Sequence, residues 1–238
     1  MNGGAVKVLV FGREKEFVRK QLKKRGLVEV SARPDAIICV GGDGTLLLAE
    51  QKYPAIPKIL VKHSSTCRKC SAHDVSLVLR KLAAHDYVVL EAMKIEATIN
   101  GARKFVGLNE INVHYKLPEA LRFSVSVNGK TVEEKVIGDG LVIATPFGSS
   151  AYFHSITRET FSTGIGVAFN NPTVEKEPLI VDEKSVVKVR ILKENGFVAC
   201  DNNRKIYSVE EGDCITVKAS KQRARLIQLH GEKFRIGV

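Results

Sequence analysis

The chain has 238 residues, of which 44% are hydrophobic and 26% are charged, and its formal net charge is +11. This composition excludes a mainly disordered chain, because the apolar surface suffices to offset the entropy lost on folding. The positive charge favours an anionic partner such as a nucleotide phosphate. Nucleic acid is not expected, since the basic residues are scattered, Trp is absent and aromatic residues make up only 6%.

The same composition predicts where the protein resides. The apolar run at residues 36–40 is far shorter than the ~18 residues that a membrane span needs, so no membrane partner is expected. Residues 1–5 lack the charged and then apolar pattern of a secretory leader. An odd number of cysteines, five, favours free thiols in a reducing compartment. Together these features predict a cytoplasmic protein.

Strand and helix patterns alternate through the first third of the chain. Gly26 is expected to end the first helix, and Asp74 is expected to cap the third. This alternation predicts an N-terminal α/β domain with a parallel sheet over residues 1–86. The predicted elements are strands at residues 8–11, 36–40 and 58–61, and helices at residues 13–24, 45–51 and 74–82.

From residue 87 onward the pattern becomes alternating and rich in β-formers. Asn100-Gly101 and Asn128-Gly129 are two-residue hairpin signals. We therefore expect a mostly antiparallel β domain over residues 87–220, with an irregular centre at residues 138–166. Residues 221–238 are expected to form a strand segment that returns to the N-terminal domain. The predicted strands lie at residues 88–100, 104–115, 123–127, 186–192, 197–200, 214–218 and 225–229.

A glycine-rich loop follows the strand predicted at residues 36–40 and opens the next helix. It reads Gly41-Gly42-Asp43-Gly44-Thr45. Glycines let the backbone approach a ligand closely, and a helix N-terminus attracts phosphate. Asp43 could accept a proton from an attacking hydroxyl or help to hold Mg²⁺ between phosphates. The alternative is a tight turn in which Asp43 only caps the helix.

A second polar loop, residues 145–152, follows a short apolar strand at residues 141–144. Just before that strand, Asp139 could accept a hydrogen bond from an amide, hydroxyl or amino group. Tyr152 could stack on a base or donate a hydrogen bond. The alternative is a structural loop with capping serines and a half-buried tyrosine.

A third cluster brings four potential zinc ligands together, His63, Cys67, Cys70 and His73. Zinc is one interpretation, and a Cys67–Cys70 disulfide is another. The simplest interpretation is a basic surface loop with two ordinary cysteines, so no protein metal site is predicted.

The glycine-rich loop and the second polar loop, in this order, resemble the NAD kinase family, and in particular a divergent, archaeal-like branch. That family carries a GGDGT loop, matched at residues 41–45, and later a segment of the form DG-x-x-x-(S/T)TP-x-GSTAY, matched at residues 139–152. An Asn-Glu pair between them is matched by Asn109-Glu110, and a late aspartate by Asp201. The chain departs from the family pattern at residues 63–70 and 153–158.

The resemblance implies transfer of the γ-phosphate of ATP to the 2′-hydroxyl of the adenosine ribose of NAD, with Mg²⁺ or another divalent metal. Polyphosphate is an alternative donor, and a homodimer or homotetramer is expected. Asp43 would be the base that faces the hydroxyl. The other expected binding residues are Gly41, Gly42, Gly44, Thr45, Asn109, Glu110, Asp139, Thr145, Ser150, Ala151, Tyr152, Ser155 and Asp201.

Two other functions stay open at this point. A related lipid or sugar kinase would use the same first loop but would not need Asn109, Asp139 or Tyr152. A non-catalytic regulator would bind NAD or NADP without turnover.

Overall fold

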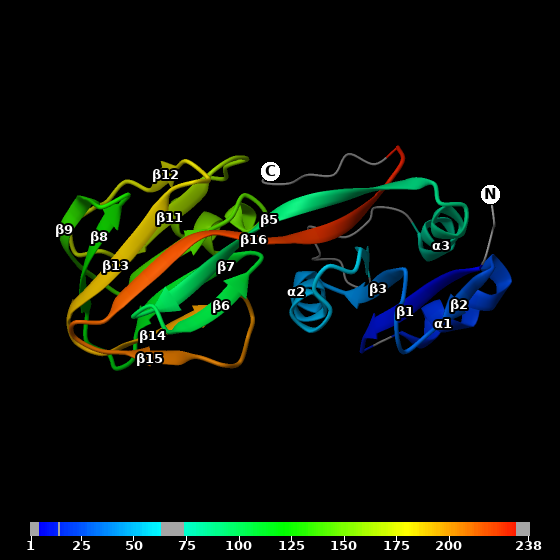
Figure 1. The fold of residues 1–238 in the computed structure, drawn as a ribbon, viewed down its shortest axis with the longest axis horizontal. Coiled ribbons are helices and arrows are strands. Elements are labelled where there is room, and N and C mark those ends of the chain that lie inside the picture. The colour runs from blue at the N-terminus through cyan, green and yellow to red at the C-terminus, as the bar shows by residue number, and fades with distance from the viewer. Residues whose placement is uncertain (1–4, 14, 63–73, 232–238) are drawn as a thin grey trace. The chain divides into compact units, whose positions relative to one another are not determined.

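The computed structural model describes residues 5–13, 15–62 and 74–231, and these fall into two compact units (Figure 1). Unit 1 contains the described residues up to Ala92 and those from Arg223 onward, and unit 2 is Met93–Gln222. The strands β5 (Tyr87–Ile99) and β16 (Cys214–Leu229) each have residues in both units. The domain boundary expected at residue 86 falls just before β5, whose residues 87–92 belong to unit 1.

Unit 1 is built on a parallel sheet with the strand order β2-β1-β3-β4. The C-terminal part of β16 adds to this sheet, where Leu226 pairs with Lys58 in parallel. The predicted parallel α/β domain is therefore confirmed. The strands are β1 (Val6–Gly12), β2 (Leu27–Glu29), β3 (Ala36–Gly41) and β4 (Lys58–Lys62).

Helices cover both faces of this sheet. On one face, α1 (Glu16–Leu22) and α3 (Val75–Ala83) bury Val18, Leu22 and Leu79 in one cluster with alternate residues of the strands. On the other face, α2 (Asp43–Lys52) packs on β3 and β4.

Both predicted helix signals are confirmed. Gly26 follows the short 3₁₀ turn Lys23–Arg25 that extends α1, and its φ of 70° is a left-handed conformation that favours glycine. Asp74 caps α3, because its carboxylate accepts hydrogen bonds from the backbone N–H groups of Ser76 (2.6 Å) and Leu77 (3.2 Å).

A fully buried ion pair joins α2 to the start of β4. The Lys58 ammonium lies 2.7 Å from a carboxylate oxygen of Glu50, and their side chains are 0% and 2% exposed. It also donates to the carbonyl oxygens of Tyr53 and Ile56, each at 2.7 Å. Three acceptors therefore surround the three N–H donors of a charge that burial would otherwise penalise heavily. The Cys39 thiol lies near this pair, and its own burial raises its pKa to about 12.

Unit 2 consists of two layers of mostly antiparallel strands around one apolar core. One layer has the order β12-β11-β10-β7-β14-β15, and in the other β13 lies between β16 and β8, with β9 beyond β8 and β6 paired to β5. The new strands are β6 (Arg103–Gly107), β7 (Glu110–Tyr115), β8 (Leu121–Val127), β9 (Lys130–Gly138), β10 (Gly140–Ala144), β11 (Ile165–Asn170), β12 (Leu179–Val181), β13 (Val186–Lys193), β14 (Gly196–Cys200) and β15 (Tyr207–Val209).

The hairpin signals form the predicted turns. Asn100 and Gly101 have φ values of 49° and 74° between β5 and β6, and Asn128 and Gly129 have 52° and 83° between β8 and β9. Two successive positive φ angles define the turn that matches strand twist in a two-residue hairpin. The predicted antiparallel β domain is confirmed.

Three predictions of element bounds are wrong. The strand expected at residues 104–115 is broken at Leu108-Asn109, and the strands expected at 214–218 and 225–229 are one strand, β16. The polar sequence between those two halves hid the continuity of β16. The centre at residues 138–166 is less irregular than expected, because besides the predicted strand (β10) it contains a π-helical turn (Ser149–Phe153) and α4 (His154–Thr157). That helical segment is too short to show a clear 3.6-residue period.

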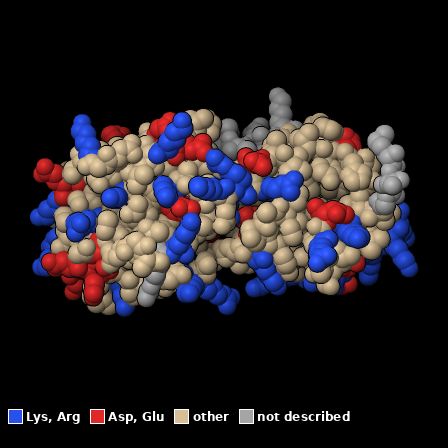
Figure 2. Space-filling model, viewed as in Figure 1, with Lys and Arg blue, Asp and Glu red and all other residues tan. Residues whose placement is uncertain are grey.

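Three further properties of the described residues complete the description. Among the described residues, no helix is long and apolar enough to cross a membrane. Cys39, Cys200 and Cys214 are free thiols. On the face drawn in Figure 2, lysine and arginine side chains are interspersed with aspartate and glutamate rather than gathered into one stripe.

The buried pair predicts a large stability effect. Replacing Lys58 with methionine (Lys58→Met) leaves the Glu50 carboxylate buried without its cation and should lower the free energy of unfolding by about 3–5 kcal/mol. Urea unfolding measures this change. The exposed control Glu16→Gln, which removes the Arg19–Glu16 pair, should cost less than about 1 kcal/mol. Adding Glu50→Leu to Lys58→Met should restore most of the loss, and no recovery in the double variant would contradict this account.

Candidate functional site

The glycine-rich loop of unit 1 connects β3 to α2. Gly42 is the N-cap with extended backbone (φ −104°, ψ −172°), and as a glycine it has no side chain with which to cap the helix. Gly42 rather than Asp43 is therefore the N-cap, and Asp43 is the first helical residue. The loop is tight, because Thr45 N–H donates to the Gly42 carbonyl at 2.9 Å.

Gly41 is the position in this loop that requires glycine. Its φ is +151°, and a Cβ there would lie 2.3 Å from the Thr45 hydroxyl oxygen. Gly44 is exposed, while Asp43 and Thr45 are half-buried. The loop therefore presents a carboxylate, a hydroxyl and bare main chain at the start of a ten-residue helix.

In unit 2, the Asp201 carboxylate organises the polar segment between β6 and β7. One carboxylate oxygen accepts from Leu108 N–H (2.9 Å), and the other accepts from the N–H groups of Asn109 (2.8 Å) and Glu110 (3.1 Å). In return, Asp201 N–H donates to the Glu110 carbonyl at 3.0 Å. Burial raises the pKa of Asp201, and the three N–H donors and the charge of Lys94 oppose that shift.

The loop that follows β10 is tied to the same segment. Thr145 N–H donates to the Asn109 carbonyl (2.9 Å), and the Thr145 hydroxyl donates to the Leu108 carbonyl (2.6 Å). The same hydroxyl accepts from Gly148 N–H at 3.0 Å. A Cβ at Gly148 would lie 2.2 Å from the Asn109 carbonyl oxygen, so only glycine fits against this main chain. Thr145 and Asp201, both expected to bind ligand, hold the backbone around Asn109.

Tyr152 follows these loops and belongs to what we call the polar face of unit 2, which comprises Glu110, Asp139, Tyr152 and Asn170. Its hydroxyl accepts from the Asn170 side-chain amide at 3.1 Å. Burial raises the pKa of Tyr152, and the nearby carboxylates of Asp139 and Glu110 add to this effect while the Asn170 hydrogen bond opposes it. The Tyr152 hydroxyl therefore keeps its proton. The expected residues Glu110 and Asp139 lie at opposite ends of the β7–β10 pairing, and both act electrostatically on Tyr152.

Asp139 lies at the junction of three strands of this layer. Its carbonyl accepts from Tyr115 N–H of β7 (2.9 Å), and its N–H donates to the Asn170 carbonyl of β11 (3.0 Å). Its carboxylate accepts from the Asn171 side-chain amide at 3.3 Å. The carboxylate is thus fixed beside the end of β11.

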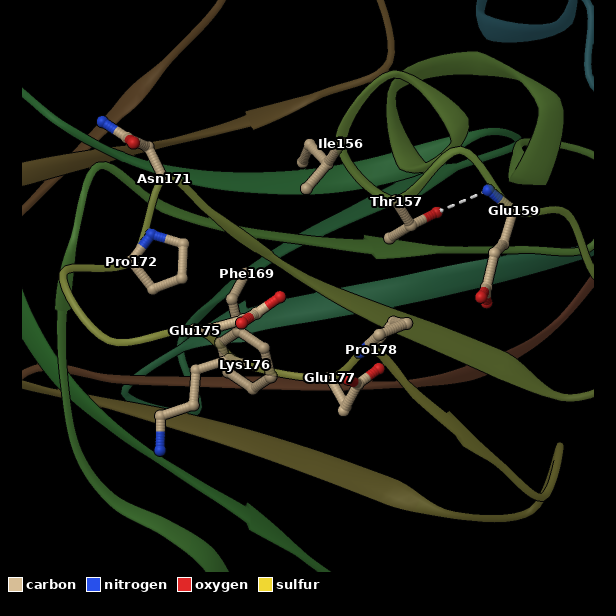
Figure 3. Close-up of a pocket in the computed structure, with 10 residues that line it drawn as sticks. All are labelled: Ile156, Thr157, Glu159, Phe169, Asn171, Pro172, Glu175, Lys176, Glu177 and Pro178. Atoms are coloured by element: carbon tan, nitrogen blue, oxygen red, sulfur yellow. Dashed lines mark hydrogen bonds between the residues drawn. The ribbon is translucent and has the colours of Figure 1, made fainter.

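A cavity of about 460 Å³ adjoins this position (Figure 3). Ile156 and Thr157 of α4 and Phe169 of β11 line it, together with Asn171, whose amide reaches Asp139. The remaining lining residues are Glu159, Pro172, Glu175, Lys176, Glu177 and Pro178. The charged residues of this lining are three glutamates and Lys176, whose ammonium pairs with Glu133 at 2.5 Å. The lining therefore carries more negative than positive charge.

The remaining expected residues occupy defined positions. Ser150 and Ala151 lie in the π-helical turn, where Ala151 has a non-helical backbone (φ −99°, ψ −118°). Ser155 is exposed and donates to the Ala151 carbonyl at 3.1 Å. The cluster of His63, Cys67, Cys70 and His73 lies outside the described residues.

Sequence analysis missed Asn170 and Asn171. They bind Tyr152 and Asp139, respectively, from the end of β11. The available signal was a pair of amide side chains directly before Pro172, at the end of an apolar run.

Comparison with known proteins assigns the chain to a family. The model of the ATP-NAD kinase C-terminal domain matches residues 108–229, a stretch that begins at the Asp201-bound segment and includes the whole polar face. The chain belongs to the ATP-NAD kinase family. The resemblance inferred from the sequence motifs is confirmed.

Curated relatives support this assignment to the family. The NAD kinase of Thermoplasma volcanium is 28% identical over 211 residues, covering 85% of this chain and 76% of the relative. The NAD kinase of Sulfurisphaera tokodaii is 27% identical over 227 residues, covering 90% of this chain and 88% of the relative. Both organisms are archaea, which agrees with the expected archaeal-like branch.

Solved structures share the fold. Yeast NADH kinase complexed with NADH has a TM-score of 0.81 at 15% identity, covering 97% of this chain and 85% of that one. An NAD kinase from Archaeoglobus fulgidus in complex with ATP has a TM-score of 0.78 at 20% identity, covering 94% of each chain. At these low sequence identities, the likeness shows that this chain shares the fold of the two solved structures.

The three backbone N–H groups that donate to the Asp201 carboxylate predict that asparagine is a poor replacement for this aspartate. In Asp201→Asn, the side-chain NH₂ replaces one acceptor oxygen beside backbone N–H donors, which should lower the free energy of unfolding by about 1–3 kcal/mol. Asp182→Asn is the matched control, because Asp182 is an aspartate of the same unit that accepts from Lys184 N–H. Urea unfolding of both variants tests this, and equal small losses would contradict it.

Proposed function

We propose that this protein is an NAD kinase that transfers the γ-phosphoryl group of ATP to the 2′-hydroxyl of the adenosine ribose of NAD, giving NADP. The observation that carries the proposal is that Tyr152 lies within electrostatic reach of both Glu110 and Asp139, inside the stretch that matches the family. A dinucleotide needs both a flat stacking surface and acceptors for its sugar hydroxyls, and these side chains offer both.

On unit 2, each residue has a proposed role in binding NAD. The Tyr152 ring stacks on a base, and the carboxylates of Glu110 and Asp139 accept hydrogen bonds from hydroxyl or amide groups. Ser150 and Ala151 contribute the π-helical turn, a distortion that is frequent at functional sites. Asp201 and Thr145 position Asn109 and Glu110 through the backbone.

The cavity beside Asp139 is proposed to receive part of the same dinucleotide. Its apolar wall, Ile156 and Phe169, suits a flat ring, and its excess of glutamates suits a ring that carries positive charge, as oxidised nicotinamide does. The Asn171–Asp139 hydrogen bond connects the cavity lining to the polar face.

On unit 1, the glycine-rich loop is proposed to serve phosphoryl transfer. The backbone at the N-terminus of α2 favours phosphate through its N–H groups and its dipole. The 2′-oxygen forms a bond to the γ-phosphorus while the bond from that phosphorus to the β,γ-bridging oxygen breaks and ADP leaves. Asp43 receives the proton of the hydroxyl.

The residues described are compatible with Mg²⁺ that arrives with ATP. Among them, no group of three or more His, Cys, Asp or Glu side chains could hold a metal by itself. Mg²⁺ in such enzymes commonly keeps several waters and is bound by substrate phosphates with one or two carboxylates, for which Asp43 is the candidate. When bound, it neutralises charge that develops on the phosphates.

The competing functions make different demands on the chain. A lipid or sugar kinase would not require the polar face of unit 2, and a regulator would bind NAD without turnover. Use of polyphosphate and assembly into a homodimer or homotetramer stay predictions.

Asp43 supplies the decisive test. Asp43→Asn removes the proton acceptor and should lower kcat for NADP formation from ATP and NAD by at least about 100-fold. Asp35→Asn is the matched control in unit 1, because Asp35 is exposed and its carboxylate accepts from Lys7 N–H. Near-wild-type turnover of Asp43→Asn would remove Asp43 from the mechanism, and NAD binding without any turnover by the wild type would favour the regulator.

Tyr152 tests the stacking role separately. Tyr152→Ala should weaken NAD binding by about tenfold or more, since stacking of a base on an aromatic ring contributes roughly 1–3 kcal/mol. Tyr152→Phe keeps the ring and should bind NAD within about threefold of the wild type. Isothermal titration calorimetry measures both affinities. Equal weakening in the two variants would assign the effect to the hydroxyl and its bond to Asn170 instead.

A further inference from the structure

Asn112, on β7, has a buried acceptor without a partner. Its side-chain oxygen, Oδ1, is shielded from solvent and has no hydrogen bond within the part of the chain that the structure describes. The great majority of buried side-chain polar atoms in proteins do have partners. Leaving a buried acceptor unsatisfied destabilises the folded state, so this atom calls for a physical explanation.

The strand register places Asn112 on the outer face of its sheet. Its neighbours Ile111 and Val113 point into the core of unit 2, so Asn112 points the opposite way. On that face it is paired with Val142 of β10 and Ala199 of β14. Neither side chain can donate a hydrogen bond, and the amide therefore lies in an apolar row.

This row adjoins the proposed NAD-binding face. Val142 belongs to the apolar cluster against which Tyr152 and Ile156 pack. Glu110 lies two residues before Asn112 on the same strand and face, and its carboxylate acts electrostatically on Tyr152. Asn112 therefore lies on the same strand face as Glu110. It is also the cross-strand neighbour of Val142, whose cluster packs against Tyr152.

We propose that Asn112 is a specificity-determining residue whose side-chain oxygen accepts a hydrogen bond from a base N–H of the bound dinucleotide. The inference rests on the proposed NAD kinase function. An acceptor excludes phosphate and carboxylate oxygens as partners, because these cannot donate. Of the two cross-strand neighbours, Val142 is fully buried, whereas the half-buried methyl group of Ala199 suits contact with a flat ring better than with a hydrated sugar. Two groups of NAD have this chemistry, the exocyclic amine of adenine and the carboxamide of nicotinamide.

The side chain is able to present its oxygen to a ligand. Asn112 is half-buried as a residue, so part of its side chain reaches the surface. Rotation about the Cβ–Cγ bond exchanges the positions of its two amide atoms, because this torsion is broad, and brings the oxygen to the accessible side of the residue.

The first experiment separates a ligand contact from a structural role. Asn112→Leu has a similar shape without hydrogen-bonding capacity. Without ligand its free energy of unfolding should equal or exceed that of the wild type, since an unsatisfied acceptor is removed. Its Kd for NAD, measured by calorimetry, should rise about tenfold, and kcat at saturating NAD should change less than about twofold. Asn112→Ala should weaken binding similarly. Marked destabilisation by both variants would show a structural role and overturn the proposal.

The second experiment identifies the donor. Nicotinamide hypoxanthine dinucleotide replaces the adenine amine with an oxygen, and nicotinic acid adenine dinucleotide replaces the carboxamide with a carboxylate. The wild type should bind one of these analogues more weakly than NAD, and Asn112→Leu should reduce that discrimination about tenfold. The affected analogue names the base. Unchanged discrimination against both analogues would overturn the proposal.

The control and the remaining outcome keep the two proposals distinguishable. Ser124→Val changes a half-buried polar residue of β8, in the other sheet of unit 2, and should leave affinity and discrimination unaltered. If the wild type binds NAD and forms NADP while Asn112→Leu binds like the wild type, the role of Asn112 alone fails. If the wild type does not bind NAD, both the function and this inference fail.

Discussion

One carboxylate determines how the polar face of unit 2 is built. Asp201 accepts hydrogen bonds from three successive backbone N–H groups, Leu108, Asn109 and Glu110. Strand pairing would otherwise use such groups, and here the chain leaves the ladder between β6 and β7. The break lets Asn109 and Glu110 follow a path that a continuous strand would not allow. Three charge-assisted hydrogen bonds offset part of the free energy cost of burying the charge.

The rest of the face is built outward from that segment. Thr145 and Gly148 bind or pack against the main chain of Leu108 and Asn109, and this contact fixes the loop that leads to Tyr152. Segments separated by up to 93 positions in the sequence thereby share one small set of backbone interactions. A face assembled in this way is preorganised, which lowers the entropy lost when a ligand binds.

The fold was predictable where a signal is local. Gly26, Asp74 and the two Asn-Gly turns each impose their conformation through their own side chain or its absence, and all four behave as predicted. Predictions failed where long-range contacts decide the outcome. The continuity of β16 depends on partners in both units, and the helical turn after Gly148 depends on packing against β10 and β11.

By itself, the sequence determined the fold class, the family and the residues of the two loops, because glycines, a carboxylate and a tyrosine at fixed spacing carry those signals locally. Only the tertiary structure decided what each residue does. It shows that Asp201 and Thr145 bind the backbone, that Asn170 and Asn171 hold Tyr152 and Asp139, and that Asn112 faces outward beside them. These roles follow from which strands become neighbours, and strand pairing brings together residues that share no pattern along the chain.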